Sequence, residues 1–236
     1  MQTTLLHACN RRPAKVAGAL IGLIALALPV TAQTILINGD FENATPAAWA
    51  SNSWAKYFEL STNSTALSGW AYASGGGAPD VVASYYPQTS PLSGAGNIAQ
   101  LGAGSNATGG SLSQLFATTT GATYTASLDV AYMGNGGGSA ITFGIYDAGN
   151  GDALVASQTT SFDSLTSSFQ RASFDFVAPS TNLLFRISDA SGPTWDTDVA
   201  ADNASVSLRA IPEPSTYAVI AGVLALSFAF WRRQRR

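Results

Sequence analysis

A two-residue alternation of apolar and polar side chains most constrains what this chain can fold into. Between Ala122 and Tyr132, every second side chain is apolar or aromatic, and those between include Thr, Ser and Asp. Successive side chains of a strand point to opposite faces, so this pattern predicts a half-buried strand. Similar short segments, separated by turn residues, are Ser111–Ala117, Ile141–Ile145, Ala153–Ser157, Ala172–Ala178, Leu183–Ile187 and Val206–Leu208. The sequence therefore predicts an all-β fold, an antiparallel β-sandwich with one wetted face on each sheet.

Composition removes several kinds of chemistry. The single histidine, His7, and the single cysteine, Cys9, both precede residue 33. A domain beginning there lacks disulfides, cysteine nucleophiles, Ser-His-Asp triads and His or Cys metal sites. Residues 33–210 hold four basic side chains against thirteen acidic ones, a formal charge of −9. That charge disfavours nucleic acid as a partner and suits either Ca²⁺ or plain solubility.

The first 32 residues read as a signal peptide. Arg11, Arg12 and Lys15 precede an apolar run over residues 16–28, and small residues then lead to a predicted cleavage between Ala32 and Gln33. Residues 33–210 would then be a β-sandwich exodomain. Its irregular, aromatic part, residues 45–91, is expected to form long loops or an insertion.

The last segment, residues 211–236, has three parts in a fixed order. A Pro-Glu-Pro motif is followed by an uncharged run of 15 residues, Tyr217–Trp231, and then by a basic end. As a helix this run is ~22 Å long, shorter than the ~30 Å hydrocarbon core of a bilayer. We expect a short C-terminal transmembrane helix whose basic end lies in the cytoplasm. The residues concerned are Pro212, Glu213 and Pro214 of the motif, and Arg232, Arg233, Arg235 and Arg236 of the basic end.

This order of parts resembles the PEP-CTERM sorting signal of Gram-negative, biofilm-forming bacteria. The resemblance implies export by the secretion machinery, a membrane-anchored intermediate, and cleavage near Pro-Glu-Pro by an exosortase. The product would reside on the cell surface or in the extracellular matrix. The alternative is an ordinary C-terminal anchor without cleavage.

A second resemblance covers most of residues 33–210. Four pieces occur in order: Asn38–Glu42, Ser113–Phe116, Gly121–Thr125 and Asp202–Val206. Together they resemble the galactose-binding-like jelly roll of many carbohydrate-binding modules. The resemblance implies a structural Ca²⁺ between the first and last strands, held by Glu42 and Asp202, with Asp40 as a further ligand. The alternative is that Asp40 caps a turn and Asp202 faces solvent.

Such modules hold sugars on aromatic faces, since the CH groups of a sugar ring pack on an aromatic ring. The candidates for this role are Trp49, Trp54, Trp70 and Trp195, with Tyr85 and Tyr86 beside them. Each of these side chains could instead belong to the core.

Three functions follow from these features. The first is an exported, non-enzymatic surface or matrix protein that binds extracellular polysaccharide. The second is an adhesion or structural protein without glycan binding. The third is a glycoside hydrolase working with two carboxylates, for which Asp129, Asp175 and Asp189 are available.

Overall fold

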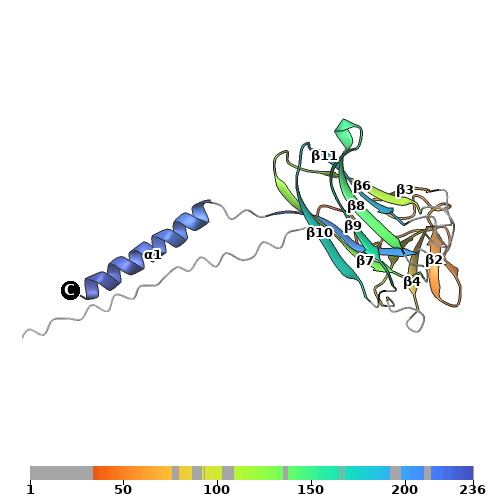
Figure 1. Ribbon diagram of the computed structural model, residues 1–236, viewed down its shortest axis with the longest axis horizontal. Helices are drawn as coiled ribbons and strands as arrows, with labels where there is room; N and C mark the ends of the chain where they lie inside the picture. Colours follow the sequence, from red (N-terminus) through yellow and green to blue (C-terminus); the bar gives the residue numbers. More distant parts are fainter. Residues whose placement is uncertain are drawn as a thin grey trace, which may run out of the picture. The chain divides into compact units, whose positions relative to one another are not determined.

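The computed structural model of the chain describes residues 34–75, 80–86, 92, 94–102, 109–134, 138–164, 166, 168–191, 198–209 and 214–235 (Figure 1). The signal peptide and its cleavage site, Ala32–Gln33, lie outside the described residues. The elements in chain order are β1 (Ala50–Ser51), β2 (Ala55–Glu59), β3 (Ala71–Ala73), β4 (Val81–Tyr85), β5 (Ile98–Leu101), β6 (Ser111–Ala117), β7 (Thr123–Tyr132), β8 (Ser139–Asp147), the 3-10 turn η1 (Ala148–Asn150), β9 (Ala153–Phe162), β10 (Gln170–Val177), β11 (Asn182–Asp189), β12 (Val199–Leu208) and the helix α1 (Pro214–Gln234).

The strands form two antiparallel sheets. The seven-stranded sheet has the order β1-β2-β4-β5-β12-β7-β10, and the five-stranded sheet has the order β3-β6-β11-β8-β9. Late in the chain the strands switch sheets at each step: β10 and β12 belong to the wider sheet and β11 to the narrower one. Switching of this kind is typical of a jelly roll. The predicted antiparallel β-sandwich is therefore confirmed.

One core lies between the sheets, and aromatic rings join its two sides. The ring of Phe143 on β8 lies 5.1 Å from that of Phe174 on β10 and 5.9 Å from that of Phe185 on β11, between centroids. Most side chains predicted to point inward are buried: Tyr124, Ala126, Leu128, Val130, Tyr132, Ile141, Phe143, Ile145, Leu183, Phe185, Ile187 and Val206. Two side chains differ from this prediction: Leu208, at the end of β12, is exposed, and Phe174 is half-buried.

The stretch 45–91 is more regular than its sequence suggests. It contains β1 to β4, and β1, β2 and β4 extend the seven-stranded sheet at one edge. The expectation of long loops is therefore wrong for this part. These strands are two to five residues long, which is too short for an alternation pattern to stand out.

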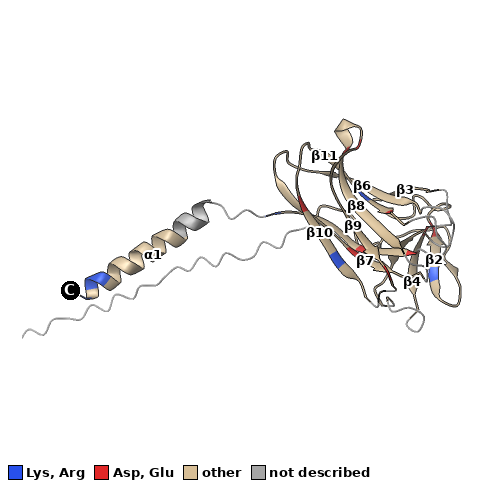
Figure 2. Ribbon diagram, viewed as in Figure 1, with Lys and Arg blue, Asp and Glu red and all other residues tan. Residues whose placement is uncertain are grey.

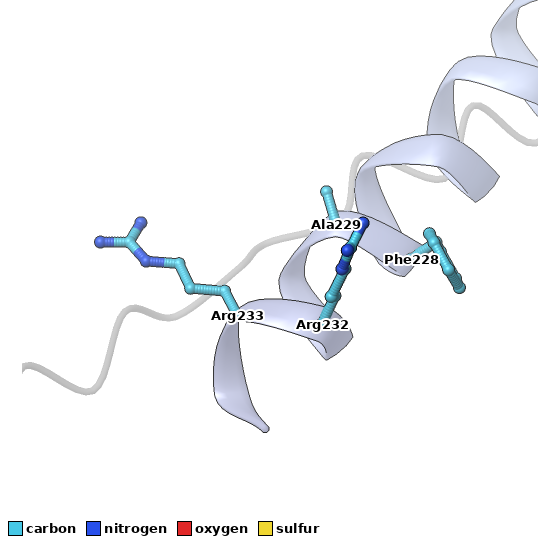
Figure 3. Close-up of a pocket in the computed structure, with 4 residues that line it drawn as sticks. All are labelled: Phe228, Ala229, Arg232 and Arg233. Carbon is cyan, nitrogen blue, oxygen red and sulfur yellow. The ribbon is translucent and has the colours of Figure 1, made fainter. Parts of the chain in front are cut away.

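Helix α1 occupies the apolar run at the C-terminal end, where a helix was predicted, and begins at Pro214. In the part of the chain that the structure describes, no helix is both long and apolar enough to cross a membrane. The last turns of α1 carry a shallow hollow of about 390 Å³, lined by Phe228, Ala229, Arg232 and Arg233 (Figure 3). Pro212, Glu213 and Arg236 lie outside the described residues.

Candidate functional site

The residues predicted to bind calcium lie where the start of the sandwich meets β12. The pairing of β12 with β7 shifts register between Asp202 and Ser205, and Asn203 there has a left-handed φ of 49°. The N–H of Ala204, inside this bulge, donates to the carbonyl of Gly39 at 2.8 Å. The bulge thus ties the Asn38–Glu42 segment to the last strand.

Asp202 is buried in negatively charged surroundings. The residue is only 3% exposed, and its Oδ1 accepts the N–H of Asn203 at 2.6 Å. The pKa of Asp202 is raised to about 7. Burial is the largest cause, and the negative charges of Asp129, Glu42 and Asp40 add to it. The alternative that Asp202 faces solvent is wrong.

The other two predicted ligands are held differently. Glu42 Oε1 accepts the N–H of Asn97 at 2.8 Å, and a Cβ at Gly96 would overlap this oxygen. Asp40 is exposed, and its Oδ1 accepts the N–H of Glu42 at 3.4 Å, which is the turn-capping alternative. All three carboxylates accept a backbone N–H; Asp202 is buried, whereas Glu42 and Asp40 are exposed.

The donor chemistry at this place fits a hard cation in part. A buried carboxylate among other carboxylates is costly to ionise, and a bound cation with oxygen ligands would remove that cost. Among the described residues, however, no group of three or more Asp, Glu, His or Cys side chains is arranged to hold a metal ion. Calcium held by Asp202 and Glu42, with Asp40 as a further ligand, stays a prediction.

Arg171 on β10 braces the bulge from the outer face of the seven-stranded sheet. Its guanidinium donates to Asp129 at 3.0 Å, to the carbonyl of Asn203 at 2.8 Å and to the hydroxyl of Ser205 at 2.9 Å. Asn203 Nδ2 in turn donates to Asp129 at 3.0 Å. This network joins β10, β7 and β12, and it fixes the backbone that positions Asp202.

The carboxylates considered for hydrolysis all take part in other contacts. Asp129 pairs with Arg171, and Asp175 pairs with Arg209. Asp189 is buried at the end of β11, where Oδ1 accepts the N–H of Ser191 at 2.8 Å. Each has a structural partner on its own sheet or in the adjoining turn.

The predicted aromatic platforms fall into three groups. Trp70 is 5% exposed and packs against Phe41 and Phe185 in the core, so it offers no free ring face and its prediction as a platform is wrong. Trp49 is half-buried, whereas Trp54 is 66% exposed. Trp195 lies outside the described residues.

The tyrosines beside them also differ in exposure. The Tyr85 hydroxyl donates to Gln100 Oε1, and burial together with the charge of Asp198 raises the pKa of Tyr85 to about 12. Tyr86, the next residue, is exposed.

The outer face of the five-stranded sheet carries a row of apolar side chains that sequence reasoning missed. Leu184 of β11 pairs with Leu115 of β6 on one side and with Tyr146 of β8 on the other, and Tyr146 pairs with Leu154 of β9. Directly paired residues share a face, so these four form one line across four strands, which we call the apolar row. Its end members are open to solvent, with Leu115 66% exposed and Leu154 59% exposed.

Two hollows adjoin the apolar row at Leu115. One, of about 660 Å³, has apolar and hydroxyl-bearing walls that include Leu184, Ser64, Thr65 and Ser113. The other, of about 530 Å³, is lined by Leu115, Phe116, Ala117, Ala148, Gly149 and Asn182. Both volumes are within the range typical of small-molecule sites, ~300–1,000 Å³.

Arg186 covers the middle of the apolar row. Its guanidinium carbon lies 4.5 Å from the centre of the Tyr146 ring, and its Nη2 lies 2.7 Å from Asp152 Oδ2. The guanidinium is thus held between the Tyr146 ring and Asp152, with hydrogen-bond donors beside an apolar surface. The face can therefore offer apolar contact and directional hydrogen bonds to one ligand.

Comparisons with known proteins give no family for this chain. No protein-family model matches it, and no curated protein matches it. Among solved structures it is similar to a CBM4 carbohydrate-binding module, with 16% identity and a TM-score of 0.41 over 74% of this chain and 99% of that one. It is also similar to the N-terminal cellulose-binding domain of a Cellulomonas fimi β-1,4-glucanase, with 14% identity and a TM-score of 0.38 over 61% and 90%. An arabinose-bound α-L-arabinofuranosidase, MgGH51, has 18% identity and a TM-score of 0.48, over 74% of this chain and 26% of that one. Likeness at this level carries no conclusion about what this chain binds.

Proposed function

We propose that this protein is a non-catalytic module that binds neutral polysaccharide across the outer face of its five-stranded sheet. The observation that carries the proposal is the apolar row, Leu115–Leu184–Tyr146–Leu154, with two hollows that Leu115 helps to line. Soluble domains seldom leave such a line of apolar side chains open unless it contacts a partner.

The chemistry of this face suits a sugar chain. Sugar rings have apolar CH faces and hydroxyl edges, so they need an apolar surface with a few polar groups around it. The row supplies the surface, and Arg186 and Ser113 lie in the adjacent line of paired residues, on the same face. Farther along, Thr142 and Thr159 add two more hydroxyls, which contact one another at 2.6 Å.

Affinity electrophoresis through gels containing single neutral polysaccharides tests this proposal. We expect at least one polymer to retard the full chain, and the Leu115→Ser and Tyr146→Ala variants to bind it about ten-fold more weakly. Val177→Ser is the matched control, because Val177 is an equally open apolar residue on the seven-stranded sheet. Retardation that is the same for all variants, or no retardation by any polymer, would contradict the proposal.

Export and sorting are proposed from the two chain ends. The signal peptide up to Ala32, the Pro212–Pro214 motif and the Arg232–Arg236 basic end support export, processing by an exosortase and a final place on the cell surface or in the matrix. The membrane would be a transient partner only, in keeping with an apolar run shorter than a bilayer core.

Intact mass in an exosortase-positive host and an isogenic exosortase-negative host tests the sorting proposal. We expect both end segments to be missing from the mature protein in the positive host, and the C-terminal segment to be retained in the negative one. Retention in both hosts would instead leave an ordinary anchored protein.

A further inference from the structure

Lys56 stands apart from the other basic residues of the sandwich. Arg171, Arg186 and Arg209 each form an ion pair with an aspartate. Among the residues that the structure describes between 34 and 209, Lys56 is the basic side chain without such a pair, and it is exposed. Lys56 is the basic residue of β2, and Figure 2 shows a blue segment on that strand.

The neighbours of Lys56 are uncharged hydrogen-bond donors. It pairs with Ser51 of β1 on one side and with Ser84 of β4 on the other. Its ammonium nitrogen lies 4.9 Å from the centre of the Trp49 ring. Glu59, the acidic residue of β2, is three positions along the strand and therefore on the opposite face. No carboxylate of these strands thus competes for the ammonium group on its own face.

Two exposed aromatic side chains lie next to these strands. Trp54 precedes β2 and Tyr86 follows β4, and the N–H of Tyr86 donates to the carbonyl of Trp54 at 3.0 Å. Both side chains are exposed. Trp54 lies two residues before Lys56, in the turn that leads into β2.

The turn that presents Trp54 is fixed by one side chain. Asn52 Oδ1 accepts the N–H of Trp54 at 2.8 Å and that of Ala55 at 2.9 Å. The N–H of Asn52 donates to the carbonyl of Ala55 at 3.1 Å. A ligand that stacks on Trp54 would therefore meet a preformed backbone and would not have to order it.

The two sheets are unequal in width. The seven-stranded sheet extends through β4 and β2 to β1, whereas the five-stranded sheet ends at the three-residue strand β3. On the Lys56 side of β2 and β4, Phe58 and Val82 are still buried in the core, whereas Lys56, two positions before Phe58, is exposed. We call the five residues Ser51, Trp54, Lys56, Ser84 and Tyr86 the wing surface.

We propose that the wing surface is a second saccharide site, selective for a sugar unit that carries a carboxylate. Lys56, Ser51 and Ser84 supply a positive charge and two hydroxyls for the carboxylate, and Trp54 supplies the ring face for the sugar. The formal charge of −9 on residues 33–210 repels densely charged polymers, so the ligand is an isolated uronic acid in an otherwise neutral chain. This site is separate from the apolar row and does not depend on it.

The test compares glucuronoxylan with the same polymer after its carboxyl groups are reduced to alcohols. We expect the full chain to bind the native polymer about ten-fold more tightly than the reduced one, from one charge-assisted contact. Lys56→Gln should abolish this preference, and Trp54→Ala should weaken binding of the native polymer. Arg209→Gln, which removes the same charge from an exposed residue elsewhere, should retain the preference.

Two outcomes would overturn the proposal: an equal preference in Lys56→Gln and the unaltered protein, or no preference in the unaltered protein. The apolar-row variant Tyr146→Ala separates the two sites. It should weaken binding of the reduced polymer and leave the Lys56-dependent preference in place. Failure of the neutral-glycan proposal would thus appear with the reduced polymer, independently of the result at the wing surface.

Discussion

At the scale of single residues, Asp202 is the side chain at which protons and a cation would compete. It is buried beside Glu42, Asp40 and Asp129, and burial is the largest cause of its raised pKa. A carboxylate in this position is uncharged at low pH or compensated by a cation at high pH. Its protonation is therefore linked both to folding and to the predicted binding of calcium.

The first prediction concerns stability against pH. The folded pKa of Asp202 is about 7 against an ordinary value of 3.8. Between these values the folded state binds the proton and the unfolded state does not, so stability falls as pH rises from about 4 to about 7. The loss amounts to a few kcal/mol, at about 1.4 kcal/mol per pH unit. Melting temperatures measured with a chelator present should be higher at pH 5 than at pH 8.

The Asp202→Asn variant and added calcium provide the controls. The variant should lack this pH dependence, and calcium should raise the melting temperature of the unaltered protein at pH 8. Equal melting temperatures with calcium and with chelator would contradict the predicted metal site. A pH dependence that persists in Asp202→Asn would assign it to another group.

The second prediction concerns Gly39. A Cβ at this position would overlap the carbonyl oxygen of Ala204, and the N–H of Ala204 already donates to the carbonyl of Gly39 at 2.8 Å. Because backbone meets backbone here, Gly39→Ala should lower the free energy of unfolding by about 2–3 kcal/mol in urea titrations. Gly149→Ala is the control, since its nearest contact would be an ordinary 3.5 Å to Asp147. Equal effects of the two variants would show that the contact can relax.

At the scale of elements, one buried carboxylate joins strands of both sheets. Asp80, which precedes β4, accepts the N–H of Gly102 after β5 at 2.8 Å and that of Gly110 before β6 at 2.7 Å. The hydroxyl of Tyr72 on β3 donates to it at 2.7 Å. Burial raises the pKa of Asp80, whereas these hydrogen bonds lower it. The side chain of Asp80 thus joins the end of β5, the start of β6 and the middle of β3 by hydrogen bonds.

The third prediction follows from this junction. In Asp80→Asn the amide nitrogen cannot accept a hydrogen bond, so at least one N–H loses its partner in a buried place. The free energy of unfolding should fall by about 2–3 kcal/mol, measured by urea titration. Tyr72→Phe should cost about 1 kcal/mol, and Asp163→Asn, at an exposed position, should cost almost nothing. Similar values for Asp80→Asn and Asp163→Asn would contradict this role.

The sequence predicts strands well where the apolar–polar alternation is long. It predicts them poorly where pairing with a neighbouring strand determines whether a strand forms and where it ends. Residues 111–117 form a strand with the predicted bounds, and 123–132 begins one residue later than predicted. The strand from Ala153 runs on to Phe162 instead of ending at Ser157, because its later residues pair with β8. The short strands in residues 45–91 depend on neighbouring strands and carry little pattern of their own.

The candidate sites could be found only once the order of the strands in each sheet was known. The alternation of apolar and polar residues does not reveal that order. Leu115 takes an outward, normally polar position in its strand, and this was the one signal available. Its alignment with Leu184 and Tyr146 exists only once β6, β11 and β8 are neighbours. Trp54 could be named as a candidate from its residue type alone. Lys56 became a candidate only because the structure pairs it with Ser51 and Ser84 on the neighbouring strands.

At the scale of the whole molecule, the two proposed saccharide sites belong to different sheets. The apolar row lies on the five-stranded sheet, and the wing surface lies at one edge of the seven-stranded sheet. Binding at one surface therefore does not occupy the other. A molecule with both sites can hold two polymer chains, or two segments of one chain, at the same time.

The fourth prediction is that the protein bridges polymers. Beads carrying a neutral polysaccharide bound by the apolar row should capture labelled glucuronoxylan only when the protein is present. Capture should be lost in Leu115→Ser and in Lys56→Gln, and it should be retained in Val177→Ser. If capture persisted in Leu115→Ser or in Lys56→Gln, one surface would be sufficient to hold both polymers, which would contradict the prediction.

The position of β12 in the fold has a mechanical consequence. It lies inside the seven-stranded sheet, paired with β7 from Val199 to Leu208, and the N–H of Ile35 donates to its Val206 carbonyl at 2.8 Å. Arg209 follows this strand, and its N–H donates to the carbonyl of Thr123 at 2.9 Å. A pull along β12 acts across hydrogen bonds that are perpendicular to the strand. The ladder is then loaded in shear, and its bonds share the force instead of opening one after another.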